Sequence, residues 1–186
     1  APDAPRPIVD ALSFSIANGE TLAVVGESGA GKSMTGLAVL GLVPPPLRVT
    51  AGEILWRGRD LVKAGERHLR AVRGGEIGLV FQEPTAAINP AIEVLRVHLG
   101  LDRRTARARA IAAMDRVRIA DAAGRFHAYP HELSGGMLQR VAIAIAVACE
   151  PELLIADEPT TALDASVQRG VLELLAEIQE VSGMAL

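Results

Sequence analysis

The chain has 186 residues, of which 49% are apolar and 22% charged, a composition that excludes a disordered chain. The formal net charge of -3 gives no reason to expect nonspecific binding to nucleic acid, and the single cysteine, Cys149, excludes an internal disulfide framework. The longest apolar run, 141–149, is far shorter than the ~20 residues that span a bilayer, so any membrane role must involve a partner.

Both ends of the sequence suggest that it is part of a longer one. Residues 1–7 are rich in proline and lack the apolar segment of a signal peptide, and there is no initiator methionine. Residues 184–186 are typical of the start of a strand that the chain does not finish. We therefore expect truncation at both ends.

The first half of the chain predicts short strands around a glycine-rich loop. The Asn18-Gly19 turn follows the first strand, and prolines 44–46 end the helix that follows the loop. The predicted elements are strands over 8–16, 21–25, 52–60 and 77–81 and a helix over 33–42.

The second half is mainly helical. From 84 to 150, apolar residues recur at spacings near 3.6 with arginines between them. Ser134 is the expected N-cap of a buried helix that runs through Cys149. A buried strand over 153–156 and a helix with an apolar stripe from 167 to 178 follow. Strands that alternate with helices predict an α/β sheet interrupted by a helical insert.

The glycine-rich loop matches a phosphate-binding pattern between a strand and a helix. Its candidate nucleotide-binding residues are Gly26, Glu27, Ser28, Gly29, Ala30, Gly31, Lys32 and Ser33. Glycines let backbone N–H groups converge on phosphate oxygens, and the helix N-terminus adds its positive end. We expect Lys32 to reach the β- and γ-phosphates and Ser33 to bind Mg²⁺. The alternative is a glycine-rich turn that binds nothing.

The choice of lysine at position 32 supports the phosphate interpretation. The chain has 17 arginines but only two lysines, Lys32 and Lys63. A lysine retained in this loop therefore suggests that the loop needs a slim ammonium group.

Two carboxylates follow the strand over 153–156. We expect Asp157 to hold Mg²⁺, directly or through water, and Glu158 to act as the general base toward the attacking water. The alternative, taken alone, is an exposed acidic strand end.

Residues 133–140, Leu-Ser-Gly-Gly-Met-Leu-Gln-Arg, form a second glycine-rich corner at a helix start. Together with the two motifs above they resemble the signature sequence of the ATP-binding-cassette (ABC) superfamily. An ordinary capped helix is the alternative for this corner alone. The resemblance implies that two cassettes pair head to tail around ATP, so that one copy's signature contacts nucleotide bound by the other. The implied contact residues are Ser134, Gly135, Gly136 and Gln139.

The resemblance covers nearly the whole chain and implies its fold class. It implies an α/β P-loop NTPase (RecA-like) core with an antiparallel β subdomain and an inserted α-helical subdomain. The core would comprise 1–83 and 150–186, and the helical signature subdomain 84–149. Gln82 matches the glutamine that senses Mg²⁺ and the attacking water, although it could be a polar strand end. Asp164 would face the partner cassette, and it could cap a helix at the same time.

The sequence also departs from the family pattern. The family's histidine that contacts the γ-phosphate would follow Leu186, and all four histidines precede the signature. No aromatic residue precedes Phe14, so the adenine-stacking residue is also missing. Trp56, Tyr129 and Cys149 are expected to be packing residues. We therefore expect the isolated chain to bind ATP weakly and to hydrolyse it poorly.

The segments over 81–84, 88–90, 129–132 and 136–140 resemble the peptide and nickel importer branch. The resemblance implies an ATP-binding and ATP-hydrolysing subunit, with Mg²⁺, that powers transport of peptides, nickel or a related small solute. Its partners would be a second ATPase subunit, identical or different, transmembrane permease subunits that dock on 84–98, and indirectly a solute-binding protein. The expected location is the cytoplasmic face of the bacterial inner membrane.

Two other functions are considered. The same cassette powers nucleic-acid repair and translation proteins, but those carry long coiled-coil or zinc insertions or two cassettes, which this sequence lacks. An inactive truncated remnant is the other, although every motif up to Asp164 is intact. The sequence does not reveal the transported solute, because the permease and the binding protein choose it.

Overall fold

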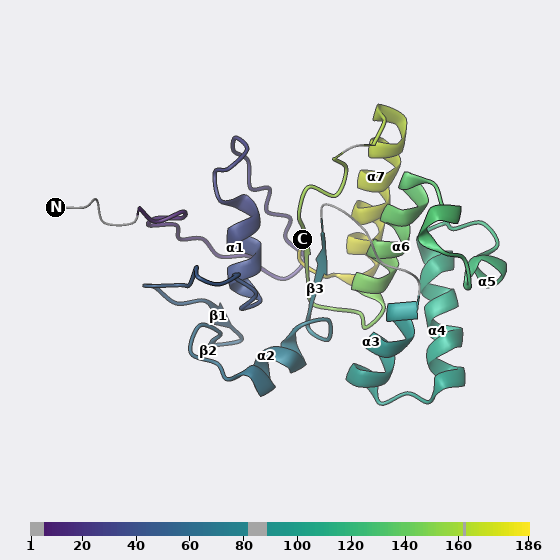
Figure 1. Cartoon of the computed structure of the whole chain (residues 1–186), viewed down its shortest axis with the longest axis horizontal. Helices are drawn as coiled ribbons and strands as arrows, with labels where there is room; N and C mark the ends of the chain where they lie inside the picture. Colours follow the sequence, from purple (N-terminus) through teal and green to yellow (C-terminus); the bar gives the residue numbers. More distant parts are fainter. Residues whose placement is uncertain (1–5, 82–88, 162) are drawn as a thin grey trace.

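The structure, a computed structural model, describes residues 6–81, 89–161 and 163–186. The helices of this part of the chain are α1 (Lys32–Val39), α2 (Glu66–Val72), α3 (Asn89–Leu99), α4 (Arg103–Arg116), α5 (Ala122–Arg125), α6 (Gly135–Val147) and α7 (Ala165–Ser182), with a 3-10 turn η1 (Pro130–Glu132). The strands are β1 (Leu55–Trp56), β2 (Arg59–Asp60), β3 (Ile77–Val80) and β4 (Leu153–Ala156). Figure 1 shows α3 to α7 on one side of β3, with α1, α2 and the β1–β2 hairpin on the other.

β3 and β4 form the parallel pair at the centre of the molecule. Ile77 lies opposite Leu153 and Val80 opposite Ala156. Both strands are apolar along their length because parallel strands are covered on both faces. The strands predicted over 77–81 and 153–156 are thus confirmed to within a residue at each end.

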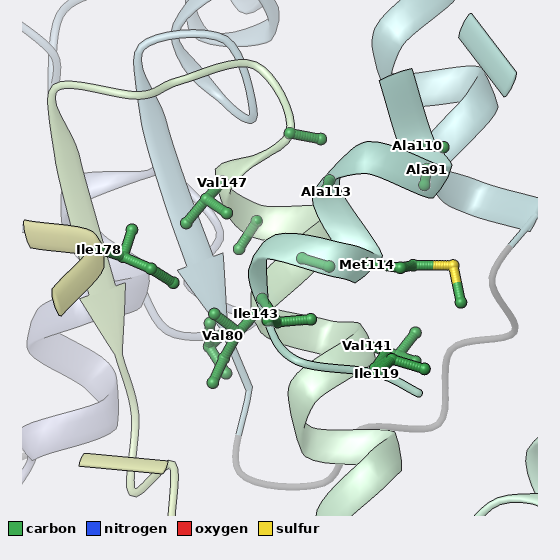
Figure 2. Close-up of a cluster of buried hydrophobic side chains, with 14 of the residues drawn as sticks. Val80, Ala91, Ala110, Ala113, Met114, Ile119, Val141, Ile143, Val147 and Ile178 are labelled. Atoms are coloured by element: carbon green, nitrogen blue, oxygen red, sulfur yellow. The ribbon is translucent and has the colours of Figure 1, made fainter. Parts of the chain in front are cut away.

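The face of the sheet that carries Val80 packs against the helices. Val80 joins Ile143 and Val147 of α6 and Ile178 of α7 in one buried cluster, which continues to Met114 of α4. In Figure 2, Val80, Ile143, Val147 and Ile178 lie around β3, and Met114 lies farther away on α4. The predicted burial of the helix after Ser134 is confirmed, because α6 touches the sheet on one side and α4 on the other.

The opposite face of the sheet packs against the first half of the chain. Ile77 and Leu153 share a second buried cluster with Leu40, which follows α1, and with Leu69 and Val72 of α2. Because side chains alternate along a strand, successive residues of β3 and of β4 pack in the two different clusters. The sheet therefore holds the two halves of the chain together.

The strands predicted over 8–16 and 21–25 are wrong. A strand needs a hydrogen-bonded neighbour along its length, and only the start of the second segment has one. Leu22 N–H donates to Leu186 O at 2.8 Å, and Leu186 N–H donates to Glu20 O at 2.8 Å. Beyond this point Val25 is 92% exposed, so the segment that enters the glycine-rich loop is extended but not paired within the described chain.

The other predicted elements form with adjusted ends. The hairpin predicted over 52–60 forms as β1 and β2. The helix predicted over 33–42 ends at Val39, because Gly41 N–H and Leu42 N–H donate back to Ala38 O and Leu37 O and close the last turn. None of the helices in the described ranges is long and apolar enough to cross a membrane.

Candidate phosphate-binding site

The loop before α1 presents uncapped backbone N–H groups. Gly31 occupies the N-cap position with φ of 89°, a left-handed conformation that disfavours a side chain. No side chain caps the first turn of α1. The first N–H groups of the helix are consequently available to an anion at its positive end.

Lys32 lies across this loop. Its Nζ donates to the carbonyl oxygens of Gly26 and Glu27, each at 3.0 Å, and lies 3.4 Å from Glu158 Oε1. The side chain is only 20% exposed. The loop thus surrounds the Lys32 ammonium group, and this positive charge would interact with a phosphate bound in the loop.

Ser33 and Asp157 come together from distant parts of the sequence. Ser33 Oγ donates to Asp157 Oδ1 at 2.9 Å. The contact forms because α1 packs closely on β4, where a Cβ added at Gly36 would lie 3.2 Å from Ile155 Cγ2. The end of β4 therefore delivers Asp157 to the first turn of α1.

This oxygen pair has the chemistry that Mg²⁺ prefers. Mg²⁺ is usually held by one or two carboxylates and substrate phosphates while it keeps several waters. Within the described ranges, no group of three or more His, Cys, Asp or Glu side chains could hold a metal. The hydroxyl of Ser33 and the carboxylate of Asp157 fit such an ion, which would take its remaining ligands from a nucleotide and water.

Glu158 is held on both of its carboxylate oxygens. Oε1 faces Lys32, and Oε2 accepts a hydrogen bond from Thr161 Oγ1 at 3.0 Å. Its backbone has φ of 47°, which is unusual for a residue with a side chain. The side chain remains 37% exposed, so water can reach it.

The second glycine-rich corner opens α6, as predicted. Ser134 caps the helix, and its Oγ accepts a hydrogen bond from Met137 N–H at 3.3 Å. Ser134 and Gly135 are exposed. A Cβ at Gly136 would lie 2.7 Å from Val167 Cγ1, so the glycine at this position also lets α7 approach α6.

The two corners belong to different parts of one molecule. In Figure 1, α1 and α6 lie on opposite sides of β3. Among the described residues, no hydrogen bond or ion pair joins 134–136 to 26–33. This placement is compatible with the predicted contact between the second corner and a nucleotide held by another copy, which stays a prediction.

Gln139 does not share the surface of this corner. It is 3% exposed, and its Nε2 has no partner among the described residues. In this single copy the side chain of Gln139 is covered, and its predicted contact with nucleotide stays a prediction.

Asp164 caps α7 and remains exposed. Its Oδ1 accepts hydrogen bonds from Ser166 Oγ at 2.6 Å and from the N–H groups of Ser166 and Val167, each at 3.0 Å. These bonds, the Ser166 hydroxyl foremost, hold the pKa of the carboxyl below its usual value. The capping alternative named for Asp164 is confirmed, and its predicted contact with a partner cassette stays a prediction.

The remaining predictions concern Gln82, the expected permease contact and three packing residues. Gln82 and residues 84–88 of the expected permease contact lie outside the described residues. Trp56 packs in the smaller apolar cluster, and Cys149 is buried, which raises the pKa of its thiol. Tyr129, which was expected to be a packing residue, stacks on His131 at the surface and is 64% exposed.

Sequence comparisons give one consistent picture. The sequence model of a family described as ABC transporter matches residues 9–161. The dipeptide transport ATP-binding protein DppD of Escherichia coli (strain K12) is 46% identical over 190 residues, which cover 98% of this chain and 58% of that protein. A putative peptide import ATP-binding protein of Brucella abortus (strain 2308) is 47% identical over 96% of this chain and 56% of its own length. The chain thus spans less than two thirds of these relatives.

Solved structures with this fold include ABC cassettes. The dimeric ATP-binding cassette MJ0796, in a post-hydrolysis state with ADP and Pi, superposes with a TM-score of 0.76 at 29% identity, covering 92% of this chain and 75% of that one. CbiO1 from Clostridium perfringens, part of the ABC transporter complex CbiONQ, gives a TM-score of 0.76 at 30% identity, covering 94% and 68%.

Proposed function

The chain belongs to the ABC transporter family and has the fold of its ATPase cassettes, and from that premise we propose that it is the ATP-binding and ATP-hydrolysing subunit of a peptide importer. The observation that carries the proposal is the meeting of Ser33 with Asp157 beside the Lys32–Glu158 pair. A phosphate-binding loop, a carboxylate suited to Mg²⁺ and a carboxylate suited to water activation thus occupy one site.

The nucleotide would be held through its phosphates. The uncapped N–H groups at the start of α1 would donate to phosphate oxygens, and residues 26–31 would surround them. Lys32 would exchange its two loop carbonyls and Glu158 for phosphate oxygens, because a polyphosphate carries more negative charge than these partners.

Ser33 and Asp157 would hold Mg²⁺ beside those phosphates, with Gln82 as the further expected ligand. The ion would neutralise charge on the phosphates during hydrolysis. Asp157 is fixed for this task because its N–H donates to Val80 O at 3.0 Å, which ties the end of β4 to β3.

Glu158 would act on the attacking water. Its carboxylate is partly exposed, and movement of Lys32 to the phosphates would free Oε1 to accept a proton from that water. Ser134 and Gly136 of a second copy would complete the site, since both belong to an exposed or half-exposed helix start and α6 lies across β3 from α1 (Figure 1).

The relatives support a proposal for the transported solute. The relatives described above are dipeptide transport and peptide import proteins, so we favour a peptide over nickel as the solute. These relatives do not favour a nucleic-acid ATPase.

The cassette would lie at the cytoplasmic face of the bacterial inner membrane and dock through 84–98 on permease subunits. We also retain 84–149 as the helical subdomain, inserted between 1–83 and 150–186.

The proposal is tested with the full-length protein assembled with its permease in vesicles. We expect ATP-dependent uptake of a labelled dipeptide, and Glu158→Gln should lower ATP hydrolysis at least about 100-fold while nucleotide still binds. Glu173→Gln is the control, because Glu173 is exposed on α7. Hydrolysis that survives Glu158→Gln would contradict the proposed mechanism. Uptake of Ni²⁺ instead of peptide would contradict the proposed solute.

A further inference from the structure

Glu158 and Thr161 are joined by two hydrogen bonds. Thr161 N–H donates to Glu158 O at 3.1 Å, which closes a four-residue turn directly after β4. Thr161 Oγ1 donates to Glu158 Oε2 at 3.0 Å. The backbone bond holds the two residues together, and the side-chain bond orients the carboxylate within that turn.

The conformation of Glu158 makes the side-chain bond possible. Its positive φ turns the chain immediately after Asp157, and Pro159 then fixes the next backbone angle. The turn brings Thr161 back over the carboxylate. A left-handed conformation in a residue with a side chain is costly, which indicates that the surrounding contacts define it.

Thr161 and Lys32 hold different oxygens of the same carboxylate. Lys32 Nζ faces Oε1, and Thr161 Oγ1 donates to Oε2. A triphosphate that draws Lys32 to its own oxygens removes the first of these contacts and leaves the second. Glu158 is 37% exposed, so without Thr161 its side chain would be free to change rotamer.

We propose that Thr161 is a positioning residue for hydrolysis, one that fixes Glu158 through Oε2 so that Oε1 points to the attacking water. This inference rests on the proposed function of Glu158 as general base. The hydroxyl does not touch the reacting atoms. It keeps the carboxylate in one orientation before the water is deprotonated, and such preorganisation lowers the activation barrier.

The test replaces Thr161 in the full-length protein assembled with its permease. Thr161→Val keeps the shape of the side chain but removes the donor, and we expect kcat to fall about tenfold, or about 1.4 kcal/mol. KM for ATP should change less than about twofold, since in the described part of the chain Thr161 hydrogen-bonds to Glu158 and to none of the candidate phosphate ligands. Thr161→Ser restores the hydroxyl and should recover most of kcat.

Thr160→Val is the matched control, because the hydrogen bonds of Thr160 among the described residues are those that its carbonyl oxygen accepts from Gln168 Nε2 and Leu163 N–H. It should leave kcat within about twofold of the parent. If Thr161→Val leaves kcat unchanged, or if it raises KM as much as it lowers kcat, Thr161 does not position Glu158. A failure of Thr161→Ser to rescue the rate would have the same meaning.

A double-mutant cycle separates this role from a general structural one. In a Glu158→Gln background, Thr161→Val should cause no further loss of the residual rate, because the hydroxyl acts only through the carboxylate. An equal tenfold loss in both backgrounds would overturn the proposal. If the parent complex hydrolyses no ATP, the proposed function itself fails, an outcome distinct from an active parent that is insensitive to Thr161→Val.

Discussion

Lys32 is the residue on which the charge of the phosphate site depends. It touches two loop carbonyls and one carboxylate within 3.4 Å, and it is one of only two lysines in a chain with 17 arginines. The ammonium fits because it is compact and its three donors can point in three directions. A guanidinium is planar and larger, so it could not take the same place without displacing the loop.

Lys32→Arg should therefore weaken ATP binding although it keeps the charge. We expect the affinity to fall at least about tenfold, measured by titration with a fluorescent ATP analogue. The control is Lys63→Arg, at the only other lysine, which is 77% exposed and pairs with Asp60. Equal affinities for the Lys32→Arg protein and its parent would show that the ammonium geometry is unimportant.

At the scale of single elements, side-chain caps define where three of the longer helices begin. Asp102 caps α4, Ser134 caps α6 and Asp164 caps α7. Asp102 accepts hydrogen bonds from Thr105 Oγ1 at 2.6 Å, Arg104 N–H at 2.9 Å and Thr105 N–H at 3.1 Å. These bonds, with the Thr105 hydroxyl foremost, lower the pKa of the Asp102 carboxyl from 3.8.

This cap makes a pH-dependent contribution to stability. Because the folded pKa of Asp102 is depressed, the ionised cap stabilises the fold above the unfolded pKa of 3.8, and the contribution is lost as pH falls through the folded pKa. Asp102→Ala should lower the urea midpoint at pH 7, and the gap to the parent should narrow below pH 3.8.

Asp115→Ala is the control for this pH dependence. Asp115 lies in the last turn of the same helix, where a negative charge gains nothing from the helix dipole. Asp115→Ala should therefore not lower the urea midpoint at pH 7 as much as Asp102→Ala does. A difference between Asp102→Ala and its parent that stays constant from pH 7 to pH 3 would refute the titrating cap.

At the scale of the whole molecule, α6 packs closely on β3, and this contact fixes the distance between the helix and the sheet. A Cβ built at Gly78 would lie 2.5 Å from Ala146 O and 3.0 Å from Leu154 Cδ1. The first neighbour is backbone within a buried helix and cannot move alone. Any side chain at Gly78 must therefore separate α6 from the sheet.

Gly78→Ala should destabilise the fold by about 1–3 kcal/mol, the usual cost of overpacking a core, measured by chemical denaturation. Gly65→Ala is the control, because a Cβ there meets nothing within 4 Å. Gly65 lies at the N-cap of α2 with φ of -72°, which alanine adopts freely. Equal stability of the two variants would show that α6 can shift on β3 at no cost.

The sequence predicted the parts of the site that are local. The loop of 26–33, the paired carboxylates after β4 and the Ser134 helix start are each defined within eight residues, because glycine conformation, strand apolarity and helix capping are short-range properties. The strands over 8–16 and 21–25 were mispredicted because pairing depends on a neighbour that local pattern does not supply. The helix α2, with only Leu69 and Val72 buried, gave too short a periodic signal to be recognised.

Only the tertiary structure brought Ser33 to Asp157, 124 positions away, and Lys32 to Glu158. The burial of Gln139, the exposure of Tyr129 and the close approach of Val167 to Gly136 were also visible only in the tertiary structure. Sequence alone determined which chemical groups the chain carries and the local backbone that presents them. Their distances and burial were decided by how α1 and α6 pack on the two faces of β3 and β4, because side-chain contacts between distant segments exist only after that packing.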